Sequence, residues 1–291
     1  MESLITIAIP FYNDHDYLRS AILSVVNQTY TNWKLILLDD GSNDGSLAIA
    51  NSFVKDCRII VLSDGKNMGL PSRLNQLSTI VDTKYYARMD ADDIMDPDRI
   101  KTELEYLEAH SDVDVIGSYA YSIDESGNVF GKINTNNRHP KTIDDILKGG
   151  GFVHPTVMGK TEWFKAHPYN EKLRRMQDLA LWFETVDTSH FVILPVYLLF
   201  YRTGKTSIKK YLRTQKYSRS FYYNVFLKER KDLRRFCLLY SKSLLKTLIY
   251  YIAFCTLGID KIINNRYVPI NEDEKNMLMS RLRISLTEYK L

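Results

Sequence analysis

The strongest constraint on the fold is an alternation of apolar, β-rich runs with stretches of helical periodicity, which begins at the N-terminus. The apolar runs lie at residues 4–11, 34–42, 58–64 and 84–93. The helical patterns lie at residues 15–28, 45–56, 70–81 and 96–110. Strands that alternate with helices in this way form a parallel sheet with right-handed crossovers. We therefore expect an α/β fold, followed less regularly by strands at 113–124 and 191–202 and a helix at 177–186.

Polar clusters follow three of these predicted strands, at the point where each strand ends. They read "PFYND" (10–14), "LLDDGSNDG" (37–45) and "RMDADD" (88–93). In an open parallel sheet, ligands bind at the carboxyl ends of the strands, so we expect the three clusters to converge on one edge.

The third cluster places three carboxylates, Asp90, Asp92 and Asp93, within four positions. Capping of the next helix needs one acid, which Asp96 or Asp98 can supply, whereas three neighbouring acids repel unless a cation lies among them. Asp90 and Asp92 alternate on an extended chain and so face one side. This spacing suits a divalent metal whose coordination is completed by a substrate's phosphates.

The "DDGSNDGS" segment (39–46) has two interpretations. It is a turn in which Asp44 caps the helix that follows, or it contributes an Asp that accepts hydrogen bonds from a base or ribose. The sequence contains neither G-x-G-x-x-G after the first strand nor G-x-x-x-x-G-K-[ST]. A dinucleotide site and a P-loop are therefore disfavoured, and a diphosphate neutralised by metal fits better.

The N-terminal residues and the cysteines indicate the cellular compartment. The opening "MESLITIAIPFYN" lacks a basic n-region and a small-residue cleavage site, so we expect no signal peptide. Cys57, Cys237 and Cys255 lie far apart, without metal-ligand spacing. This pattern favours a reducing cytosol and three buried or inert thiols.

The charge is distributed unevenly along the chain. Between Lys205 and Lys246 there are 13 Lys and Arg against 2 Asp and Glu, interleaved with Tyr and Phe. The apolar run at 248–259 is shorter than the roughly 20 residues that a spanning helix needs. The region is predicted to bind an anionic membrane surface. A helical subdomain with a solvated basic face and a nucleic-acid-binding region are the alternatives, the last disfavoured because no such motif is present.

The order and spacing of several motifs resemble those of the family 2 glycosyltransferases. The motifs are "IPFYNDHDYLRSAILSVVNQTYTNWKLILLDDGSNDGS", "KNMGL", "ARMDADDIMDPDRI", "HPTVM" and "QDLALW". The resemblance covers roughly residues 4–205. It implies the Rossmann-like GT-A fold of nucleotide-diphospho-sugar transferases, with a central, mostly parallel sheet flanked by helices, to which this chain adds a helical C-terminal extension.

The resemblance implies an enzyme that transfers a sugar from a nucleotide diphosphate sugar, with inversion, aided by Mn²⁺ or Mg²⁺. Asp90 and Asp92 match the family's D-x-D metal-binding pair. The positions that would bind the nucleotide sugar are Pro10, Tyr12, Asp40, Arg88, Asp90 and His154. Of these, Tyr12 matches the aromatic that stacks on the base, and Asp40 matches the residue that contacts uracil.

The same resemblance implies a general base at Asp178, at the start of the predicted helix. The family pattern has Glu–Asp there, whereas this chain has Gln177 before Asp178. A capping role for Asp178 is the alternative. Family members often carry a metal-binding His in the segment where this chain has Gly204 and Lys205, so Lys205 could reach the diphosphate only as a point charge.

Taken together, we expect a catalytic domain at 1–205, with a nucleotide-binding half at about 1–112 and an acceptor-binding half at 113–205, and a basic helical region at 206–291. The expected partners are a UDP-sugar donor, a glycan or lipid-linked glycan acceptor and an anionic membrane surface, but no nucleic acid. The expected location is the cytoplasmic face of the cell membrane, where a surface polysaccharide is built. A nucleotidyltransferase that makes the nucleotide sugar and a non-catalytic membrane-binding module are the alternatives.

Overall fold

The computed structural model describes residues 4–133, 139–204, 207–257 and 267–288 of the chain. It divides the chain into two compact units, Met1–Arg202 with Pro269–Leu291, and Thr203–Val268. The first boundary falls close to the predicted one at residue 205. The second differs from the prediction, because the last residues return to the first unit instead of extending the basic region.

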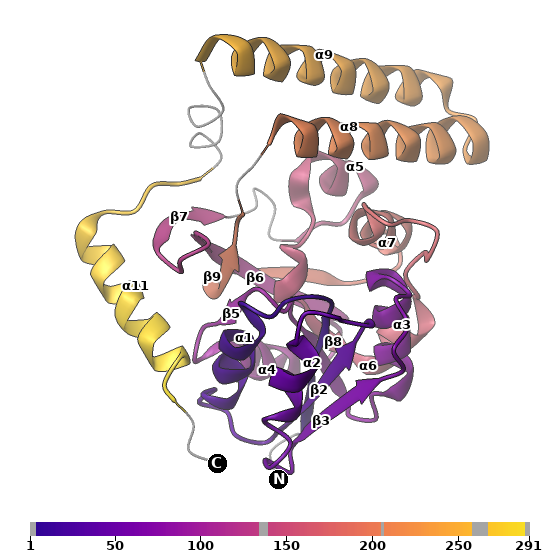
Figure 1. The fold of residues 1–291 in the computed structure, drawn as a ribbon. Helices are drawn as coiled ribbons and strands as arrows, with labels where there is room; N and C mark the ends of the chain where they lie inside the picture. Colours follow the sequence, from indigo (N-terminus) through magenta and orange to yellow (C-terminus); the bar gives the residue numbers. More distant parts are fainter. Residues whose placement is uncertain (1–3, 134–138, 205–206, 258–266, 289–291) are drawn as a thin grey trace. The chain divides into compact units, whose positions relative to one another are not determined.

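The first half of the first unit is the predicted strand–helix alternation (Figure 1). Its strands are β1 (Ile5–Phe11), β2 (Trp33–Asp39), β3 (Ile59–Ser63) and β4 (Tyr85–Arg88). Its helices are α1 (Leu18–Val26), α2 (Ser46–Asn51), α3 (Leu70–Ile80) and α4 (Arg99–Ala109). The four strands pair in parallel in the order β3-β2-β1-β4. This part of the sheet is as the alternation predicts.

Beyond β4 the sheet is mixed. The further strands are β5 (Ile94–Met95), β6 (Val115–Ile123), β7 (Val129–Ile133), β8 (Met158–Lys160) and β9 (Phe191–Arg202). β8 pairs antiparallel with both β4 and β6, and β9 pairs in parallel with β6 and antiparallel with β5. The helical segments between them are α5 (Ile143–Asp145), η1 (Ile146–Gly150), η2 (His154–Thr156), α6 (Thr161–Ala166) and α7 (Gln177–Thr185). A parallel arrangement therefore holds for one half of the sheet only.

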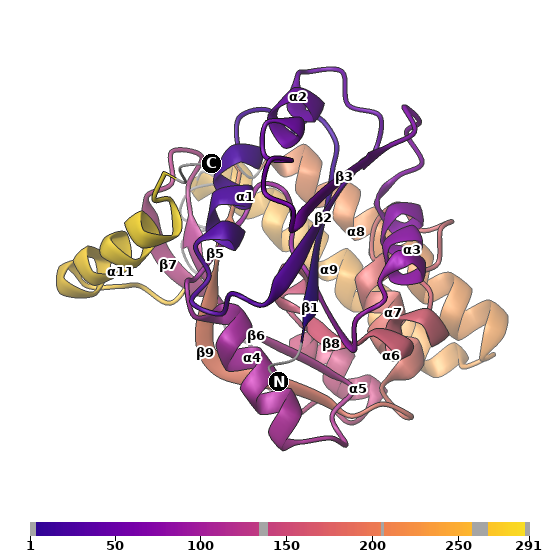
Figure 2. The ribbon, with the colours of Figure 1, turned by 90° about the horizontal axis from the view of Figure 1, so that it is seen from below.

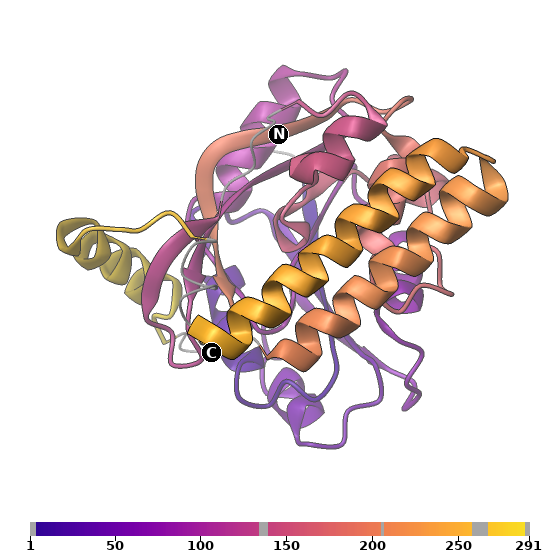
Figure 3. The ribbon, with the colours of Figure 1, turned by 90° about the horizontal axis from the view of Figure 1, so that it is seen from above.

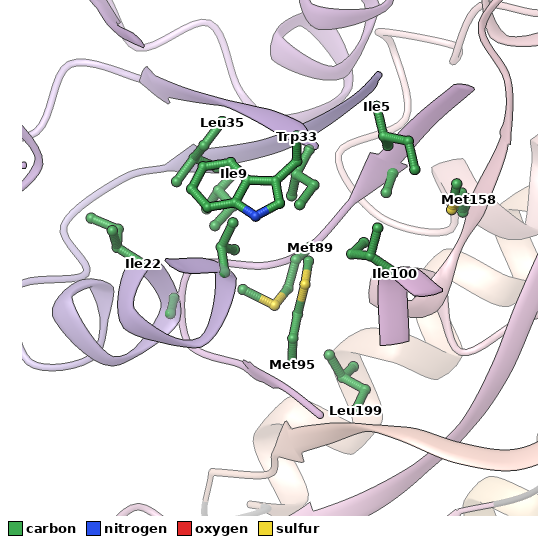
Figure 4. Close-up of a cluster of buried hydrophobic side chains, with 14 of the residues drawn as sticks. Ile5, Ile9, Ile22, Trp33, Leu35, Met89, Met95, Ile100, Met158 and Leu199 are labelled. Carbon is green, nitrogen blue, oxygen red and sulfur yellow. The ribbon is translucent and has the colours of Figure 1, made fainter. Parts of the chain in front are cut away.

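The core follows from the two-residue period of the buried strands. Ile5, Ile7, Ile9 and Phe11 face one side of the sheet and pack with residues of α1, α2 and α4. Figure 4 shows part of this cluster, in which Trp33 of β2 lies above Met89 and Met95. On the opposite face lie α3 and α6 (Figure 2). The strand ends are thus fixed between two packed layers.

The second unit is helical. It contains α8 (Ile208–Tyr222), the π-helical segment η3 (Tyr223–Glu229) and α9 (Leu233–Leu257). α8 and α9 lie side by side as a hairpin (Figure 3), joined by the stacked rings of Tyr211 and Tyr250 and by hydrogen bonds from Arg219 to Ser243 and Thr247. The apolar run predicted at 248–259 is thus largely part of a 25-residue helix.

The prediction of three buried or inert thiols is wrong as regards burial, because Cys57, Cys237 and Cys255 are all exposed and none forms a disulfide. Cys57 lies in the turn that precedes β3, and the other two lie on α9. Cysteine is commonly buried, but these positions belong to a surface turn and a two-helix unit with little interior.

Candidate functional site

The three polar clusters meet as predicted. In the parallel register Phe11 lies beside Asp39, and Ala8 lies beside Arg88, so the ends of β1, β2 and β4 share one edge. A cavity of about 320 Å³ opens there. Its lining residues are Pro10, Phe11, Tyr12, Asp14, Asp40, Leu70, Arg73, Asp90, Ala91 and Asp92. Five of the predicted site residues therefore line a single cavity, whereas Arg88, His154 and Asp178 lie outside this lining.

Tyr12 lies at the mouth of the cavity and is 45% exposed, which leaves its ring available for stacking. Hydrogen bonds hold the loop that carries it: the Tyr12 N–H donates to Asp14 (3.0 Å), and the Asp14 N–H donates to Ser46 Oγ (2.9 Å). The His15 N–H donates to Asp44 (3.0 Å). Much of the "DDGSNDGS" segment thus supports the Tyr12 loop. Asp44 also accepts from the Ser46 N–H, but the N-cap residue of α2 is Gly45, so the interpretation of Asp44 as the cap is wrong.

Asp40 is buried, and its carboxylate is fully engaged. It accepts from Arg73 Nε (2.8 Å) and from the backbone N–H groups of Met68 and Gly69. Arg73 is completely buried and also donates to Asp64 (2.6 Å). The loop that carries these N–H groups packs so closely that a Cβ on Gly41 would lie 2.9 Å from the Lys66 carbonyl carbon. The charge of Asp40 is therefore balanced inside the cavity wall.

Arg73 is a site residue that the sequence analysis missed. The signal was present, because Arg73 occupies the core-facing spacing of α3 between Leu70, Leu74 and Leu77. A buried arginine at an apolar helical position needs an acidic partner.

Replacing Arg73 should be strongly destabilising. We expect Arg73→Ala to lower the free energy of unfolding by about 3–5 kcal/mol, because it leaves Asp40 buried and uncompensated. Arg73→Lys should lose less, since a cation remains, although it lacks the fork that reaches both acids. Denaturant unfolding of both variants measures this difference, and equal stability of Arg73→Ala and wild type would contradict it.

The carboxylates lie in a turn after β4, not on an extended strand as the spacing argument assumed. β4 ends at Arg88, and the strand after the turn, β5, begins at Ile94. The turn nevertheless gathers one oxygen from each of Asp90, Asp92 and Asp93 within 4.8 Å of one another. The three carboxylates are therefore gathered by the turn and not by strand alternation, and the metal site stays a prediction.

The electrostatics of this turn fit a bound cation. Burial raises the pKa of Asp92 to about 6, and the charges of Asp90 and Asp14 add to this rise. Asp93 is fully buried, and its Oδ2 atom has no hydrogen-bond partner. Burial and the two neighbouring acids raise its pKa well above the usual range. Clustered carboxylate oxygens of this kind are the donors that Mg²⁺ and Mn²⁺ prefer.

Arg88 connects this turn to a second group of polar side chains. It is 1% exposed and pairs with Asp90, while its Nε and Nη1 atoms have no partner. Its positive charge also lowers the pKa of Asp178 and the pKa of His154. Arg88 therefore pairs directly with the carboxylate turn and acts electrostatically on the residues predicted to act on the acceptor.

Asp178 is the second residue of α7, whose N-cap is Met176 in a left-handed conformation, so the capping alternative for Asp178 is wrong. Burial raises the pKa of Asp178, while a backbone N–H at the helix start and Arg88 oppose the rise. The negative charge of Asp90 adds to the rise in the pKa of Asp178.

His154 is buried and its Nε2 atom lies 2.8 Å from the hydroxyl of Tyr169. Burial and the charge of Arg88 hold its pKa well below the usual value, so the ring is neutral.

The His154 ring contacts Trp182 of α7, whose Nε1 atom is buried without a partner. The Gln177 Oε1 and Tyr86 hydroxyl atoms are also buried and unpaired. Polar atoms left unpaired in this way are available to a ligand. Lys205 lies outside the described residues.

The mixed sheet flanked by helices has the GT-A architecture. Residues 6–168 match the family model described as Glycosyl transferase family 2. An uncharacterized glycosyltransferase of Methanocaldococcus jannaschii, MJ1057, is 30% identical over 239 residues, which cover 80% of this chain and 82% of that protein. The chain therefore belongs to glycosyl transferase family 2 and is a glycosyltransferase.

Two further comparisons agree. An uncharacterized glycosyltransferase of Haemophilus influenzae is 30% identical over 210 residues, covering 68% of this chain and 65% of that protein. The crystal structure of S. aureus TarS 1–349 in complex with UDP-GlcNAc superposes with a TM-score of 0.60 at 14% identity. The match covers 89% of this chain and 78% of that one. At this identity the likeness concerns the fold.

Proposed function

We propose that the protein is a metal-dependent, inverting glycosyltransferase that moves a sugar from a UDP-sugar to a hydroxyl of a glycan acceptor. The observation that carries the proposal is the convergence of Tyr12, Asp40, Arg73 and the carboxylate turn on one cavity. An exposed aromatic ring beside paired polar groups suits a base and ribose. Clustered acids suit the metal complex of a diphosphate better than a free anion. The structural likeness to TarS, which binds UDP-GlcNAc, supports uracil as the base.

The metal would be held by Asp90 and Asp92, with Asp93 available from the same turn. When bound, Mn²⁺ or Mg²⁺ would neutralise the charge that develops on the departing diphosphate. The buried guanidinium of Arg88 pairs with Asp90 and would add a fixed positive charge beside the carboxylate turn. Such fixed charges stabilise a transition state without reorganisation.

Asp178 would act as the general base on the acceptor side. The acceptor oxygen forms a bond to the anomeric carbon while the bond from that carbon to the diphosphate oxygen breaks. Asp178 takes the hydroxyl proton, and the nucleotide diphosphate leaves with the bonding electron pair. The raised pKa of Asp178 suits this role, because a base is most effective when its pKa approaches the working pH. The neutral His154 and its partner Tyr169 would hold hydroxyls of the sugar or acceptor by hydrogen bonds.

Incubating the protein with Mn²⁺ and a panel of nucleotide sugars tests this assignment. Slow release of UDP from one UDP-sugar is expected, since water can replace the missing acceptor. NMR of the released sugar should then show the opposite anomeric configuration to that of the donor. Hydrolysis with retention would contradict the inverting mechanism, and release of pyrophosphate from a nucleoside triphosphate and a sugar phosphate would favour the nucleotidyltransferase alternative.

The helical second unit supports attachment to an anionic membrane surface, where a lipid-linked acceptor of surface polysaccharide synthesis would be reached. Large apolar side chains of α9 are about half exposed: Leu238, Leu244, Leu245, Leu248, Ile249, Tyr251 and Ile252. Exposed Lys242 and Lys246 lie among them on the same helix. Across the described parts of the chain, no helix has the length and apolar character to cross a bilayer. An exposed apolar face flanked by cations suits binding at the interface instead.

Sedimentation with lipid vesicles tests the attachment. We expect wild type to bind vesicles that contain phosphatidylglycerol, and to bind neutral phosphatidylcholine vesicles far less. Leu245→Glu with Ile249→Glu should weaken binding at least about tenfold, because two apolar side chains would no longer enter the interface. Ile284→Glu, a 55% exposed position on the helix α11 (Glu272–Ser285), is the matched control. Failure of wild type to sediment with either vesicle would favour the plain helical subdomain.

A further inference from the structure

The helix α11 follows the basic second unit in the sequence but packs against the first unit. Leu278 and Leu282 of α11 are buried in a small core with Ile94 of β5 and Phe200 of β9. Ile94 is the first residue after the carboxylate turn. Figure 2 shows α11 beside β5 and β7, outside the sheet. The chain's last helix therefore packs on the strand into which the carboxylate turn leads.

Arg281 of α11 forms a forked ion pair with the segment just after the turn. Its Nε and Nη2 atoms donate to the two carboxylate oxygens of Asp96 at 2.6 and 2.5 Å, and Nη2 also donates to Asp98 at 2.7 Å. Asp96 is buried, whereas the side chains of Arg281 and Asp98 are 37% and 44% exposed. The bidentate geometry with Asp96, more than shielding from water, is what makes this pair hold the segment better than an ordinary surface pair. Both acids are candidate helix caps in the sequence; Asp98 is the N-cap residue of α4, but its side chain makes no capping hydrogen bond, and both carboxylates are bonded to Arg281.

Backbone groups of the same segment are held as well. The Ser285 hydroxyl at the end of α11 donates to the carbonyl oxygen of Met95 (2.8 Å). The side chain of Asn27 donates to the carbonyl oxygens of Ser285 and Thr287. β5 is thus fixed between its strand partner β9 and α11.

The turn itself is held by Arg202, the last residue of β9. Its backbone N–H donates to Asp93 Oδ1 (2.8 Å), and its Nε atom donates to the carbonyl oxygen of Asp92 (2.8 Å). Its Nη1 atom donates to the carbonyl oxygen of Asp124 (2.7 Å). Arg202 is the last residue of the N-terminal segment of the first unit (Met1–Arg202). Helix α11 lies in the C-terminal segment of the same unit (Pro269–Leu291). Of the two segments that flank the basic unit in sequence, the first bonds the carboxylate turn through Arg202, and the second, α11, bonds the residues that directly follow it.

We propose that α11 is a brace for the carboxylate turn and that Arg281 is a positioning residue for the cation. One oxygen from each of Asp90, Asp92 and Asp93 lies within 4.8 Å of the others, and carboxylates held so close repel, so an unsupported turn would open when no cation is bound. Binding would then include the cost of closing it, which lowers the apparent affinity. The Arg281 pair, Ser285 and the α11 core keep the end of the turn in place. This inference rests on the proposed metal site.

Mn²⁺ binding measured by electron paramagnetic resonance, in the presence of UDP, tests the brace. Relative to wild type, Arg281→Ala should bind Mn²⁺ about tenfold more weakly, the lower end of the range for residues that orient metal ligands. Arg281→Lys should lose about threefold, because a cation remains without the fork. Arg283→Ala, two positions along the same helix and exposed, is the matched control and should equal wild type. Binding of UDP without metal should change less than twofold in all three variants.

The outcomes separate this inference from the function on which it rests. Loss of thermal stability in Arg281→Ala with unchanged Mn²⁺ affinity would overturn the brace and leave the metal site intact. If Arg281→Ala does not fold, Arg281→Lys decides, and an unchanged affinity there overturns the brace equally. Wild type that binds no Mn²⁺ with UDP would overturn the proposed metal site and the brace together.

Discussion

Asp178→Asn is expected to reduce the rate of sugar transfer by about 10²- to 10⁴-fold, the usual contribution of a positioned general base. The asparagine keeps the shape of the side chain and its place at the start of α7, but it cannot accept the acceptor's proton. UDP affinity should stay within about twofold of wild type, because Asp178 does not line the cavity proposed for the nucleotide. Steady-state kinetics with a saturating donor, together with UDP titration, measure both quantities.

The matched control is Asp187→Asn, an exposed acid just beyond the end of α7, which should behave as wild type. In wild type, kcat should fall as the pH drops through the raised pKa of Asp178, since only the ionised carboxylate accepts a proton. Transfer by Asp178→Asn at a rate near that of wild type would remove Asp178 from the base role. Gln177 carries no charge, so it offers no replacement base at that position.

Asp92→Asn is expected to abolish metal-dependent turnover, with a loss of at least about 10³-fold, and to remove measurable Mn²⁺ binding. The substitution replaces a negatively charged oxygen donor with a neutral amide in a three-carboxylate cluster. Mn²⁺ titration with and without UDP gives the first readout, and turnover over a range of Mn²⁺ concentrations gives the second. Asp16→Asn, which neutralises an exposed acid outside the turn, is the control and should retain both.

The pH dependence of Mn²⁺ binding gives a further readout of the same residue. Asp92 has a pKa of about 6, so below pH 6 a proton must leave before the metal can bind. The Mn²⁺ affinity of wild type should therefore fall by up to about tenfold for each pH unit below 6. The folding stability of the metal-free protein should change in the opposite direction and rise as the pH falls. Its folded state holds more protons than the unfolded chain between pH 3.8 and 6, so this group makes unfolding harder as the pH falls through that window. A flat Mn²⁺ affinity between pH 5 and 7 would contradict the role of Asp92.

The parts of the fold that the sequence predicted best are those governed by local periodicity. β9 and α7 match their predicted ranges to within a residue, because the apolar runs and helical spacing there coincide with buried faces. One topological rule, that parallel strands end at the same edge of a sheet, was enough to predict the shared cavity. This rule brings together Pro10, Tyr12, Asp40 and the carboxylates.

What the sequence did not predict depends on pairings between distant segments. Arg281 and Asp96 are 185 positions apart, and nothing local in either segment indicates the partner. The early end of β4 at Arg88 reflects tertiary contacts around Met89 and Asp93 rather than propensity. Helix α4 begins at Arg99, three residues later than predicted, with Asp98 at its N-cap position; the Asp98 side chain pairs with Arg281 of α11 and forms no capping hydrogen bond.

The central claim is that acids from separate segments hold a dication so that a nucleotide diphosphate can bind and leave. Calorimetric titration of UDP into wild type, with and without Mn²⁺, tests it most directly. The account predicts that Mn²⁺ tightens UDP binding at least about tenfold in wild type and has no effect in Asp92→Asn. UDP affinity that is the same with and without Mn²⁺, in both proteins, would contradict it.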